Sequence, residues 1–475
     1  MSGPYLLPDD GRVHLVGVGG AGMSALARLM LARGVPVSGT DAKESRRLVA
    51  LRSLGAQVEI GHASEVLDAE PALRVVVAST AIPASNPEIV AARERSIPVW
   101  TRAQALNAVM QGTEPVAVAG THGKTTTTSM VTVALQSCGV DPSFAIGSEL
   151  QSSGTNAHWG SGRHFVVEAD ESDGSFLLIE PLIGIITNVE ADHLDHWSDY
   201  TAIEDAFVEF GRHVGTGTVV SCADDPGART VAERLRAEGI DVVTYGVADD
   251  ADVRIVEADL HDRVDASGQR GWSFGIVANG VRVGRIALQV PGRHNALNAT
   301  AAVATALRLG LPFEQVAEGL SSFTGTARRF ELRGEVGGVR VYDDYAHHPT
   351  EVDATLRAAR EVAGAGRVLV VFQSHRYTRT AAFAREFGEA LGLADEVVVL
   401  EVYSAGEQAI PGASGSVIAA AVPLASDSVA FEPSFARVPQ VVADRVRAGD
   451  IVLTMGAGDV GLLAPEIVEI LRTRS

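Results

Sequence analysis

The stretch VAVAGTHGKTTTTSM, residues 116–130, has the pattern of a buried strand, a glycine turn and a helix. Glycines at 120 and 123 let the backbone approach phosphate oxygens closely, and the amides at the helix start favour a bound anion. Lys124 is placed to reach the β- and γ-phosphates, while the hydroxyl of Thr125 is placed to ligate Mg²⁺ or Mn²⁺. The stretch therefore predicts a loop for the phosphates of ATP, formed by Gly120, Thr121, His122, Gly123, Lys124, Thr125 and Thr126.

This loop is shorter than the common phosphate-binding loop, in which another glycine stands further upstream. Val118 occupies that position here, which leaves the pattern GxxGKT. An ordinary glycine turn between a strand and a helix is the alternative interpretation. The lysine followed by four threonines favours a nucleotide site instead.

Composition excludes several classes of protein. The 475 residues predict about two to four domains, and 59 acidic against 39 basic residues argue against nucleic-acid binding. The two cysteines, Cys138 and Cys222, do not suggest a disulfide scaffold. No signal peptide and no apolar run of about 18 residues are found. We therefore expect a soluble cytoplasmic protein without membrane insertion; a monomer and a homodimer both stay open.

Short apolar strands alternate with helical stretches, which predicts α/β domains with parallel sheets. We expect three of them: a Rossmann-like domain at 1–113, a central ATPase-like domain at 114–327 and a second Rossmann-like domain at 328–475. Two-residue alternation around residues 253–290 predicts a small antiparallel sheet in the central domain. Strands are expected at 12–16, 35–39, 75–78 and 98–100, then at 116–119, 165–168, 183–188 and 218–221, then at 339–342, 368–372, 396–400 and 451–455.

A second glycine turn lies near the N-terminus, in HLVGVGGAGMSALA at residues 14–27. Gly17, Gly19 and Gly22 fit the pattern GxGxxG, and Asp41 lies about 20 residues further on, after a second strand. The pattern alone is typical of a dinucleotide site, so an NAD-dependent oxidoreductase is an alternative. The glycine pattern by itself predicts only that an anionic group such as a pyrophosphate can bind at this turn.

Two acidic segments follow predicted strands of the central domain. In FVVEADESDGSF, residues 165–176, Glu168 ends a strand, and its carboxylate is a candidate metal ligand beside Thr125. The acids at 170, 171 and 173 are expected to lie in a solvated loop. In TNVEADHLDHW, residues 187–197, His193 follows a strand expected to be parallel to the first, and it is a second candidate for the metal site.

Polar side chains also mark a helix start in PGRHNALNATAA, residues 291–302. It carries His294, Asn295 and Asn298, and an asparagine amide can pair with the edge of adenine. A helix cap is the alternative role for Asn295. In the third domain, FQSHRYTRT at 372–380 carries Arg376 and Arg379, which are spaced to clamp a carboxylate; a pair of surface arginines is the alternative.

Together these motifs resemble the Mur ligase family over nearly the whole chain. The set is far more specific than any one motif. In the family's order, it consists of GVGGAGM, GTHGKTTT, EADESD, NVEADHLD, GRHNALNA, FTGTARRF, DDYAHHPTEV, FQSHRYTRT, EVYSAGE and GAGD.

The resemblance implies a role for each domain. The N-terminal domain would bind the UDP of a sugar nucleotide rather than NAD, the central domain would bind ATP and the metal, and the C-terminal domain would bind an amino acid. His193 lies where other members use a carbamylated lysine, and Ser374 stands where proline is common. The implied UDP-sugar site is Gly17, Gly19, Gly20, Ala21, Gly22, Met23 and Asp41; Arg328, Arg329 and Asp344 would contact ATP, and Tyr345, His347, Arg376 and Arg379 would bind the amino acid.

Within the family, the resemblance is strongest to members that add L-alanine to UDP-N-acetylmuramate. It implies that ATP phosphorylates a carboxylate and that the amine of alanine attacks the acyl phosphate. Lys124, Glu168, His193 and His347 would be the catalytic residues, and His347 or His375 would accept the amine's proton. A tripeptide-recycling ligase and an ATP-driven binding module are the other functions considered.

Overall fold

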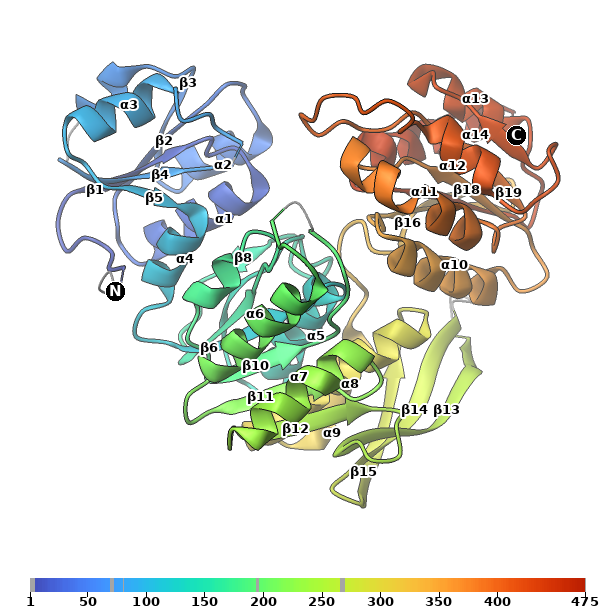
Figure 1. Ribbon diagram of the computed structural model, residues 1–475, viewed down its shortest axis with the longest axis horizontal. Coiled ribbons are helices and arrows are strands. Elements are labelled where there is room, and N and C mark those ends of the chain that lie inside the picture. The colour runs from blue at the N-terminus through green and yellow to red at the C-terminus, as the bar shows by residue number, and fades with distance from the viewer. Residues whose placement is uncertain (1–4, 69–71, 80, 194–195, 265–269, 475) are drawn as a thin grey trace. The chain divides into compact units, whose positions relative to one another are not determined.

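The computed structural model describes residues 5–68, 72–79, 81–193, 196–264 and 270–474. It confirms a three-domain α/β fold, with one sheet in each domain (Figure 1). The chain forms two compact units. The first comprises Met1–Val256, Gly275–Arg285 and Leu297–Leu320, and the second comprises Glu257–Phe274, Ile286–Ala296 and Ser321–Ser475.

The N-terminal sheet has five parallel strands in the order β3-β2-β1-β4-β5. The chain leaves β1 for β2 on one side and returns to β4 on the other, so the loop after β1 lies at a switch point, where α/β sheets bind ligands. Strands are β1 (Arg12–Val16), β2 (Val37–Asp41), β3 (Gln57–Ile60), β4 (Leu73–Ala78) and β5 (Val99–Thr101), and helices are α1 (Ala21–Ala32), α2 (Arg46–Ser53), α3 (Pro87–Glu94) and α4 (Arg102–Met110).

The central sheet has the order β15-β14-β13-β12-β11-β10-β6-β9-β7-β8. Strand β6 pairs in parallel with β10 and β9, so the carboxyl ends of these three strands meet at one edge. Strands are β6 (Glu114–Ala119), β7 (Ser143–Ala145), β8 (Ala157–His158), β9 (His164–Glu168), β10 (Ile183–Ile186), β11 (Thr218–Cys222) and β12 (Val242–Gly246), and helices are α5 (Lys124–Ser137), α6 (Tyr200–Arg212) and α7 (Pro226–Ala237).

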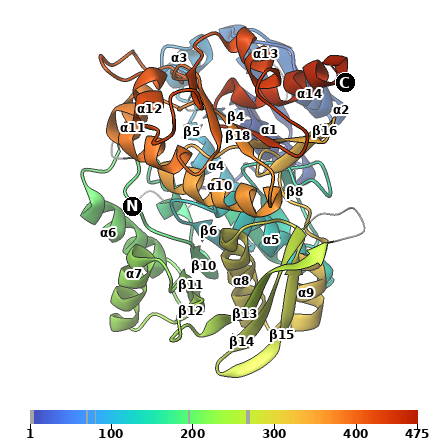
Figure 2. The ribbon, with the colours of Figure 1, turned by 90° about the vertical axis from the view of Figure 1, so that its right-hand side faces the viewer.

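The three strands expected as a small antiparallel sheet continue the central sheet at its β12 edge. Strand β13 pairs with β12 in parallel. Helix α9 lies beside β15 (Figure 2), where Gly284 leaves room for the ring of Phe313. The elements are β13 (Val253–Val264), β14 (Arg270–Ala278), β15 (Val281–Leu288), α8 (Arg293–Arg308) and α9 (Phe313–Ser322).

The C-terminal sheet has six strands in the order β16-β17-β21-β18-β19-β20, of which only the β16–β17 pair is antiparallel. Two apolar clusters fill the space between this sheet and its helices: one includes Leu356 and Phe387, and the other includes Val438 and Ile467. The elements are β16 (Glu331–Val336), β17 (Val339–Asp344), β18 (Val368–Phe372), β19 (Glu396–Val399), β20 (Val429–Phe431), β21 (Ile451–Met455), α10 (Pro349–Ala363), α11 (Tyr377–Leu391), α12 (Gly415–Ala421), α13 (Val438–Ala443) and α14 (Leu463–Arg474).

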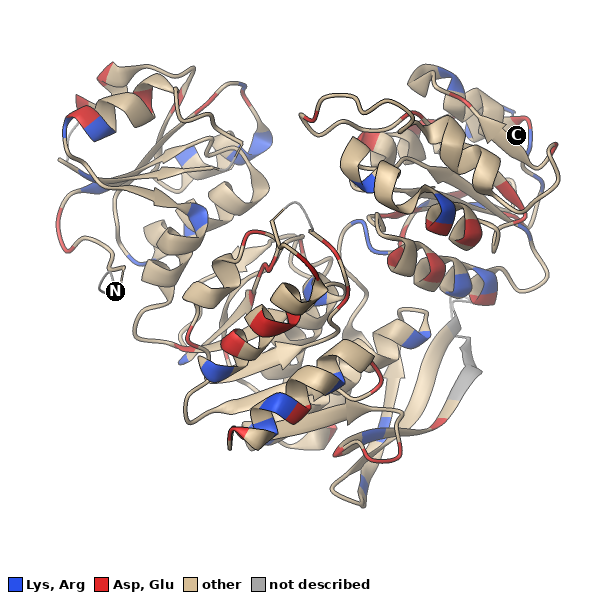
Figure 3. Ribbon diagram, viewed as in Figure 1, with Lys and Arg blue, Asp and Glu red and all other residues tan. Residues whose placement is uncertain are grey.

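The distribution of charged residues and the state of the two cysteines agree with what the composition predicts. Acidic and basic residues are interspersed over all three domains (Figure 3). Cys138 and Cys222 are free thiols. In the part of the chain that the structure describes, no helix is long and apolar enough to cross a membrane.

Candidate active site

The loop between β6 and α5 depends on two glycines with positive φ. Gly120 has φ +134°, and a Cβ there would collide with the hydroxyl of Thr187. Gly123 has φ +81° and is the N-cap of α5. Because L residues rarely adopt these angles, the two glycines allow the close turn that exposes the amides at the helix start.

The segment that follows β10 holds this loop in place. Thr187 donates its hydroxyl to the carbonyl of His122 at 2.6 Å. The side-chain amide of Asn188 binds both backbone groups of the same residue. Its oxygen accepts from the His122 N–H at 2.8 Å, and its nitrogen donates to the His122 carbonyl at 3.0 Å. The Thr121 hydroxyl accepts from the Glu190 N–H at 2.9 Å. The loop is therefore held by residues that lie 65 to 69 positions away along the chain.

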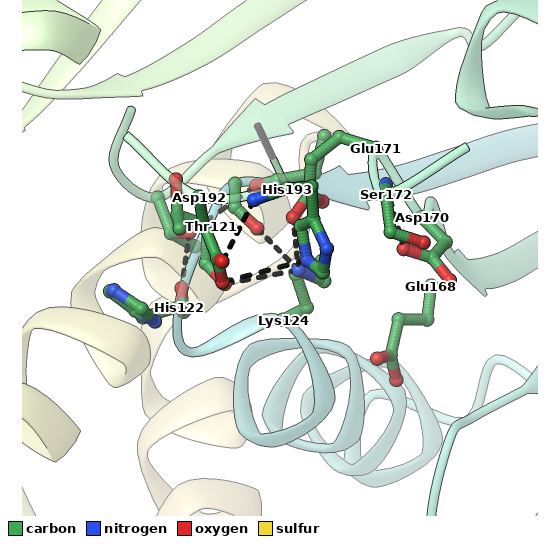
Figure 4. A network of polar contacts seen from close by, with 12 residues as sticks. Thr121, His122, Lys124, Glu168, Asp170, Glu171, Ser172, Asp192 and His193 are labelled. Carbon is green, nitrogen blue, oxygen red and sulfur yellow. Dashed lines mark hydrogen bonds and ion pairs between the residues drawn. The ribbon is translucent and has the colours of Figure 1, made fainter. Parts of the chain in front are cut away.

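Lys124 lies at the first position of α5 with its ammonium group enclosed by acceptors. Nζ donates to the carbonyls of Gly120 at 2.6 Å and Thr121 at 3.1 Å, and to Glu171 Oε1 at 2.9 Å (Figure 4). Burial alone would lower the pKa of Lys124, but the charges of Glu171 and Asp170 outweigh burial and raise it. Lys124 is therefore a permanent cation at the position where phosphates are expected.

The expectation that Glu171 is a solvated acid is wrong. Its side chain is only 4% exposed, and burial raises the pKa of its carboxyl to about 7 although Lys124 opposes the shift. Trp197 also donates its indole N–H to the Glu171 carbonyl at 3.1 Å, which fixes the segment from a second side. Asp170 is half-buried as well, whereas Asp173 is exposed as expected.

Thr125 and Glu168, the two residues predicted to supply oxygen ligands to a metal, lie in contact. The Thr125 hydroxyl lies 3.0 Å from both carboxylate oxygens of Glu168, and the Gly147 N–H donates to Glu168 Oε2 at 2.8 Å. A hydroxyl beside a carboxylate suits Mg²⁺, which prefers hard oxygen ligands. The residues present therefore fit the cation expected with ATP.

His193 lies on the segment after β10, beside Asp192. Its Nε2 is 3.5 Å from Asp192 Oδ2, and its N–H donates to Asp192 Oδ1 at 2.8 Å. The backbone of His193 has φ +53°, an uncommon angle for a residue with a side chain. Figure 4 shows Asp192 and His193 in one polar network with the start of α5.

Asn298 supports the phosphate loop directly. Its Oδ1 accepts from the Thr127 hydroxyl at 3.1 Å, and a Cβ at Gly123 would lie 2.9 Å from that oxygen. Asn295 donates to the carbonyl of Pro291 at 2.6 Å. His294 belongs, like Asn295, to the second compact unit, and burial lowers its pKa to about 4.

The N-terminal glycine turn resembles the phosphate loop, because it too joins a strand to a helix through a glycine with positive φ. Gly17 has φ +80°, and the Gly19 N–H donates to Asp41 Oδ2 at 2.9 Å. Gly20 is the N-cap of α1, so Ala21, Gly22 and Met23 form its first turn. The predicted residues therefore lie together at the switch point of the sheet.

A cavity of about 340 Å³ joins this turn to the central domain. Asn156 of the central domain donates to the Ala21 carbonyl at 3.3 Å, which helps to hold the two walls together. The cavity therefore reaches from the start of α1 to the carboxylate that contacts Thr125. Its lining is Gly20, Ala21, Gly22, Met23, Ala25, Leu26, Leu29, Ser79, Arg102, Leu106, Ala145, Ile146, Gly147, Glu168 and Asp170.

The start of the C-terminal domain holds Arg328 and Arg329 over one aromatic ring. Their guanidinium carbons lie 5.0 and 5.2 Å from the ring centre of Tyr345. Arg328 also donates to Asp343 at 2.9 Å. Asp344 is buried and accepts from the Phe330 and Ala346 N–H groups at 2.7 and 2.8 Å; burial raises its pKa to about 6.

A run of aromatic rings passes through the residues predicted to bind the amino acid. Tyr345, His347, His375 and Tyr403 follow one another with centroid separations of 5.3, 6.3 and 5.5 Å. Burial lowers the pKa of His375 to about 4, with the charges of His347, Arg379 and Arg376 acting in the same direction. His375 is therefore neutral near pH 7.

The two arginines of the predicted clamp differ in setting. Arg376 precedes α11 as its N-cap with φ +74°, and its Nε lies 3.9 Å from Glu407 Oε1. Arg379 lies inside the first turn and is buried. They are therefore not two neighbours on one helical face, although both stand at the carboxyl end of β18.

Sequence reasoning missed several residues of these sites, among them four with charged or aromatic side chains. Glu171 contacts Lys124 of the phosphate loop, and Arg102 lines the cavity. Tyr403 stacks on His375, and Glu407 lies near Arg376. The motif EVYSAGE contains Tyr403 and Glu407, so a signal was present for these two. No sequence signal marks Arg102, because it lies outside all of the motifs.

Three family models match the chain in succession. The Mur ligase catalytic domain matches residues 12–113, the Mur ligase middle domain matches residues 118–306, and the Mur ligase glutamate ligase domain matches residues 328–458.

Full-length relatives and solved structures are similar as well. UDP-N-acetylmuramate–L-alanine ligases of Acidothermus cellulolyticus and Saccharopolyspora erythraea are 56% and 53% identical, covering 99% and 96% of this chain and 97% and 92% of their own. The UDP-N-acetylmuramate–alanine ligase structure of Thermotoga maritima has a TM-score of 0.80 at 31% identity, over 98% of this chain and all of its own. A murein peptide ligase of Psychrobacter arcticus has a TM-score of 0.68 at 26% identity, over 97% and 99%.

Proposed function

The chain belongs to the Mur ligase family, and from that premise we propose that it joins L-alanine to the lactyl carboxylate of UDP-N-acetylmuramate. The reaction consumes ATP, forms ADP and supplies a precursor of peptidoglycan. The observation that carries this proposal is the cavity that begins at the N-terminal glycine turn and ends at Glu168, beside the phosphate loop. Family membership sets aside the NAD-dependent oxidoreductase.

Each domain has one substrate in this proposal. Residues 1–113 bind the UDP-sugar, residues 114–327 bind ATP, and residues 328–475 bind L-alanine. The reaction takes place in the cytoplasm, where ATP is made. The UDP-sugar lies along the cavity with its pyrophosphate near Gly20 and its carboxylate near Glu168.

Positioning and charge stabilisation account for the chemistry, with no protein nucleophile. The carboxylate of the sugar nucleotide attacks the γ-phosphate and becomes an acyl phosphate, and ADP leaves. Lys124 stabilises the charge that develops on the transferred phosphoryl group. Mg²⁺ held by Thr125 and Glu168, with His193 beside them, would neutralise further phosphate charge.

The second step forms the amide. The amine of alanine attacks the acyl carbon, and phosphate leaves from the tetrahedral intermediate. Arg376 and Arg379 hold the alanine carboxylate, and Tyr345 and His347 form the remaining wall. Since His375 is neutral near pH 7, it can accept a proton, but its low pKa makes it a weak base.

A phosphate-release assay tests the function. Release from ATP should require UDP-N-acetylmuramate and L-alanine together, and mass spectrometry should identify the alanyl product. Glycine and L-serine, tested in parallel, measure selectivity. Release that needs no amino acid, or that responds to a tripeptide but not to L-alanine, would contradict the proposal.

A further inference from the structure

Among the described residues that line the cavity, Arg102 is the one cation. The other charged residues of that wall are Glu168 and Asp170, both acidic. Arg102 is half-buried, and no hydrogen bond or ion pair joins its guanidinium to any residue within the described ranges. Its charge helps to lower the pKa of the neighbouring Asp170, but the five N–H donors of the guanidinium remain available to a ligand.

The place of Arg102 on its helix is electrostatically unfavourable. It is the first residue of α4, and no acid lies in the first turn of that helix. A cation there meets the positive end of the helix dipole, which is unfavourable. The Thr101–Gln104 capping box already stabilises the helix start, so Arg102 is not needed as a cap. A bound anion would remove the conflict.

The contacts of the Arg102 side chain show which part of the cavity it lies in. A Cβ at Gly22 would lie 3.1 Å from Arg102 Cδ and 3.5 Å from Nε and Nη1. The third glycine of GxGxxG therefore makes room for this arginine beside the first turn of α1. The first turn of α1 and the Arg102 side chain therefore line the cavity side by side.

We propose that Arg102 binds the pyrophosphate of the sugar nucleotide, together with the amides at the start of α1. This inference rests on the proposed function and deepens it. The lactyl carboxylate is the other anionic group of the substrate, but it must reach the ATP phosphates and therefore belongs near Glu168. A planar fork of donors suits two phosphate oxygens at once, which a lysine does not reproduce.

Calorimetric titration without ATP tests the assignment. The ligands are UDP-N-acetylmuramate and UDP-N-acetylglucosamine, which has the pyrophosphate but lacks the lactyl carboxylate. Arg102→Gln should weaken both by a similar factor, about 10- to 100-fold for the loss of charge-assisted hydrogen bonds, and Arg102→Lys should fall between. Arg95→Gln is the control, because Arg95 lies in the same domain, pairs with Asp68 at 2.6 Å and lies outside the cavity.

The outcomes separate the two proposals. Unchanged affinity of Arg102→Gln for both ligands, with ligation by the wild type intact, would overturn the role of Arg102 alone. A loss confined to UDP-N-acetylmuramate would assign Arg102 to the carboxylate and would also overturn it. Failure of the wild type to bind UDP-N-acetylmuramate would overturn the proposed function itself.

Discussion

Replacing Glu171 with glutamine should strengthen ATP binding. An ammonium group has three donors, and those of Lys124 are used by Gly120, Thr121 and Glu171. A phosphate oxygen that binds Lys124 must replace one of these acceptors. The two carbonyls are fixed by the turn, whereas the carboxylate carries the same charge as the phosphate. We therefore expect Glu171 to be displaced.

The magnitude follows from the strength of the bond that is broken. A hydrogen bond between charged groups contributes about 1.5–3 kcal/mol, and one to a neutral acceptor contributes about 0.5–1.5 kcal/mol. Because glutamine offers the weaker acceptor, its displacement costs about 1–1.5 kcal/mol less. The dissociation constant for ATP should fall by about 5- to 10-fold.

The assay is calorimetric titration with a non-hydrolysable ATP analogue at pH 8 and pH 6. Burial raises the pKa of Glu171 to about 7. The wild type therefore carries the charge at pH 8 and largely loses it at pH 6, where the difference from Glu171→Gln should shrink. Asp173→Asn is the control, since Asp173 is an exposed acid of the same segment that accepts from Ser175. Equal or weaker binding by Glu171→Gln at pH 8, or equal strengthening by the control, would refute the reasoning.

Four further outcomes are expected. Lys124→Ala should lower amide formation at least about 100-fold with an unchanged far-UV circular dichroism spectrum, and full ligation would remove the assignment of the phosphate loop. Arg376→Ala should raise the KM for L-alanine about 10-fold or more, with little change in the KM for ATP. Gly120→Ala should abolish ATP binding in calorimetry, because its Cβ would collide with the Thr187 hydroxyl. Histidine NMR should find His375 titrating near pH 4; since its folded-state pKa is lowered, its contribution to stability is full above about pH 6.5 and is lost as the pH falls toward 4.

Buried apolar strands could be located from the sequence, whereas exposed ones could not. Expected and observed bounds coincide for β1, β18 and β21, whose side chains are all buried. Strand β3 has the pattern QVEI with mostly exposed side chains, and β16 is an edge strand of mixed polarity, so neither has an apolar run to reveal it. Pairing partners are also hidden, since alternation does not say that β13 joins β12.

The candidate site was predictable where a motif carries its own chemistry. The loop, Thr125 and Glu168 meet as the spacing of parallel strands predicts. Glu171 was not predictable, because its burial depends on Lys124 and Trp197, which are distant in sequence. Arg376 illustrates a second limit: a spacing of three suggests one helical face, but a left-handed backbone places this residue outside the helix.

The bonds from Thr187 and Asn188 to the phosphate loop also bear on how ATP is captured. They join groups of the protein alone, so folding itself fixes the conformation of the loop. Binding then has little ordering entropy left to oppose it. Asn188→Ala would shift that entropic cost from folding to association, and the nucleotide would bind more slowly to a loop that must first find its shape.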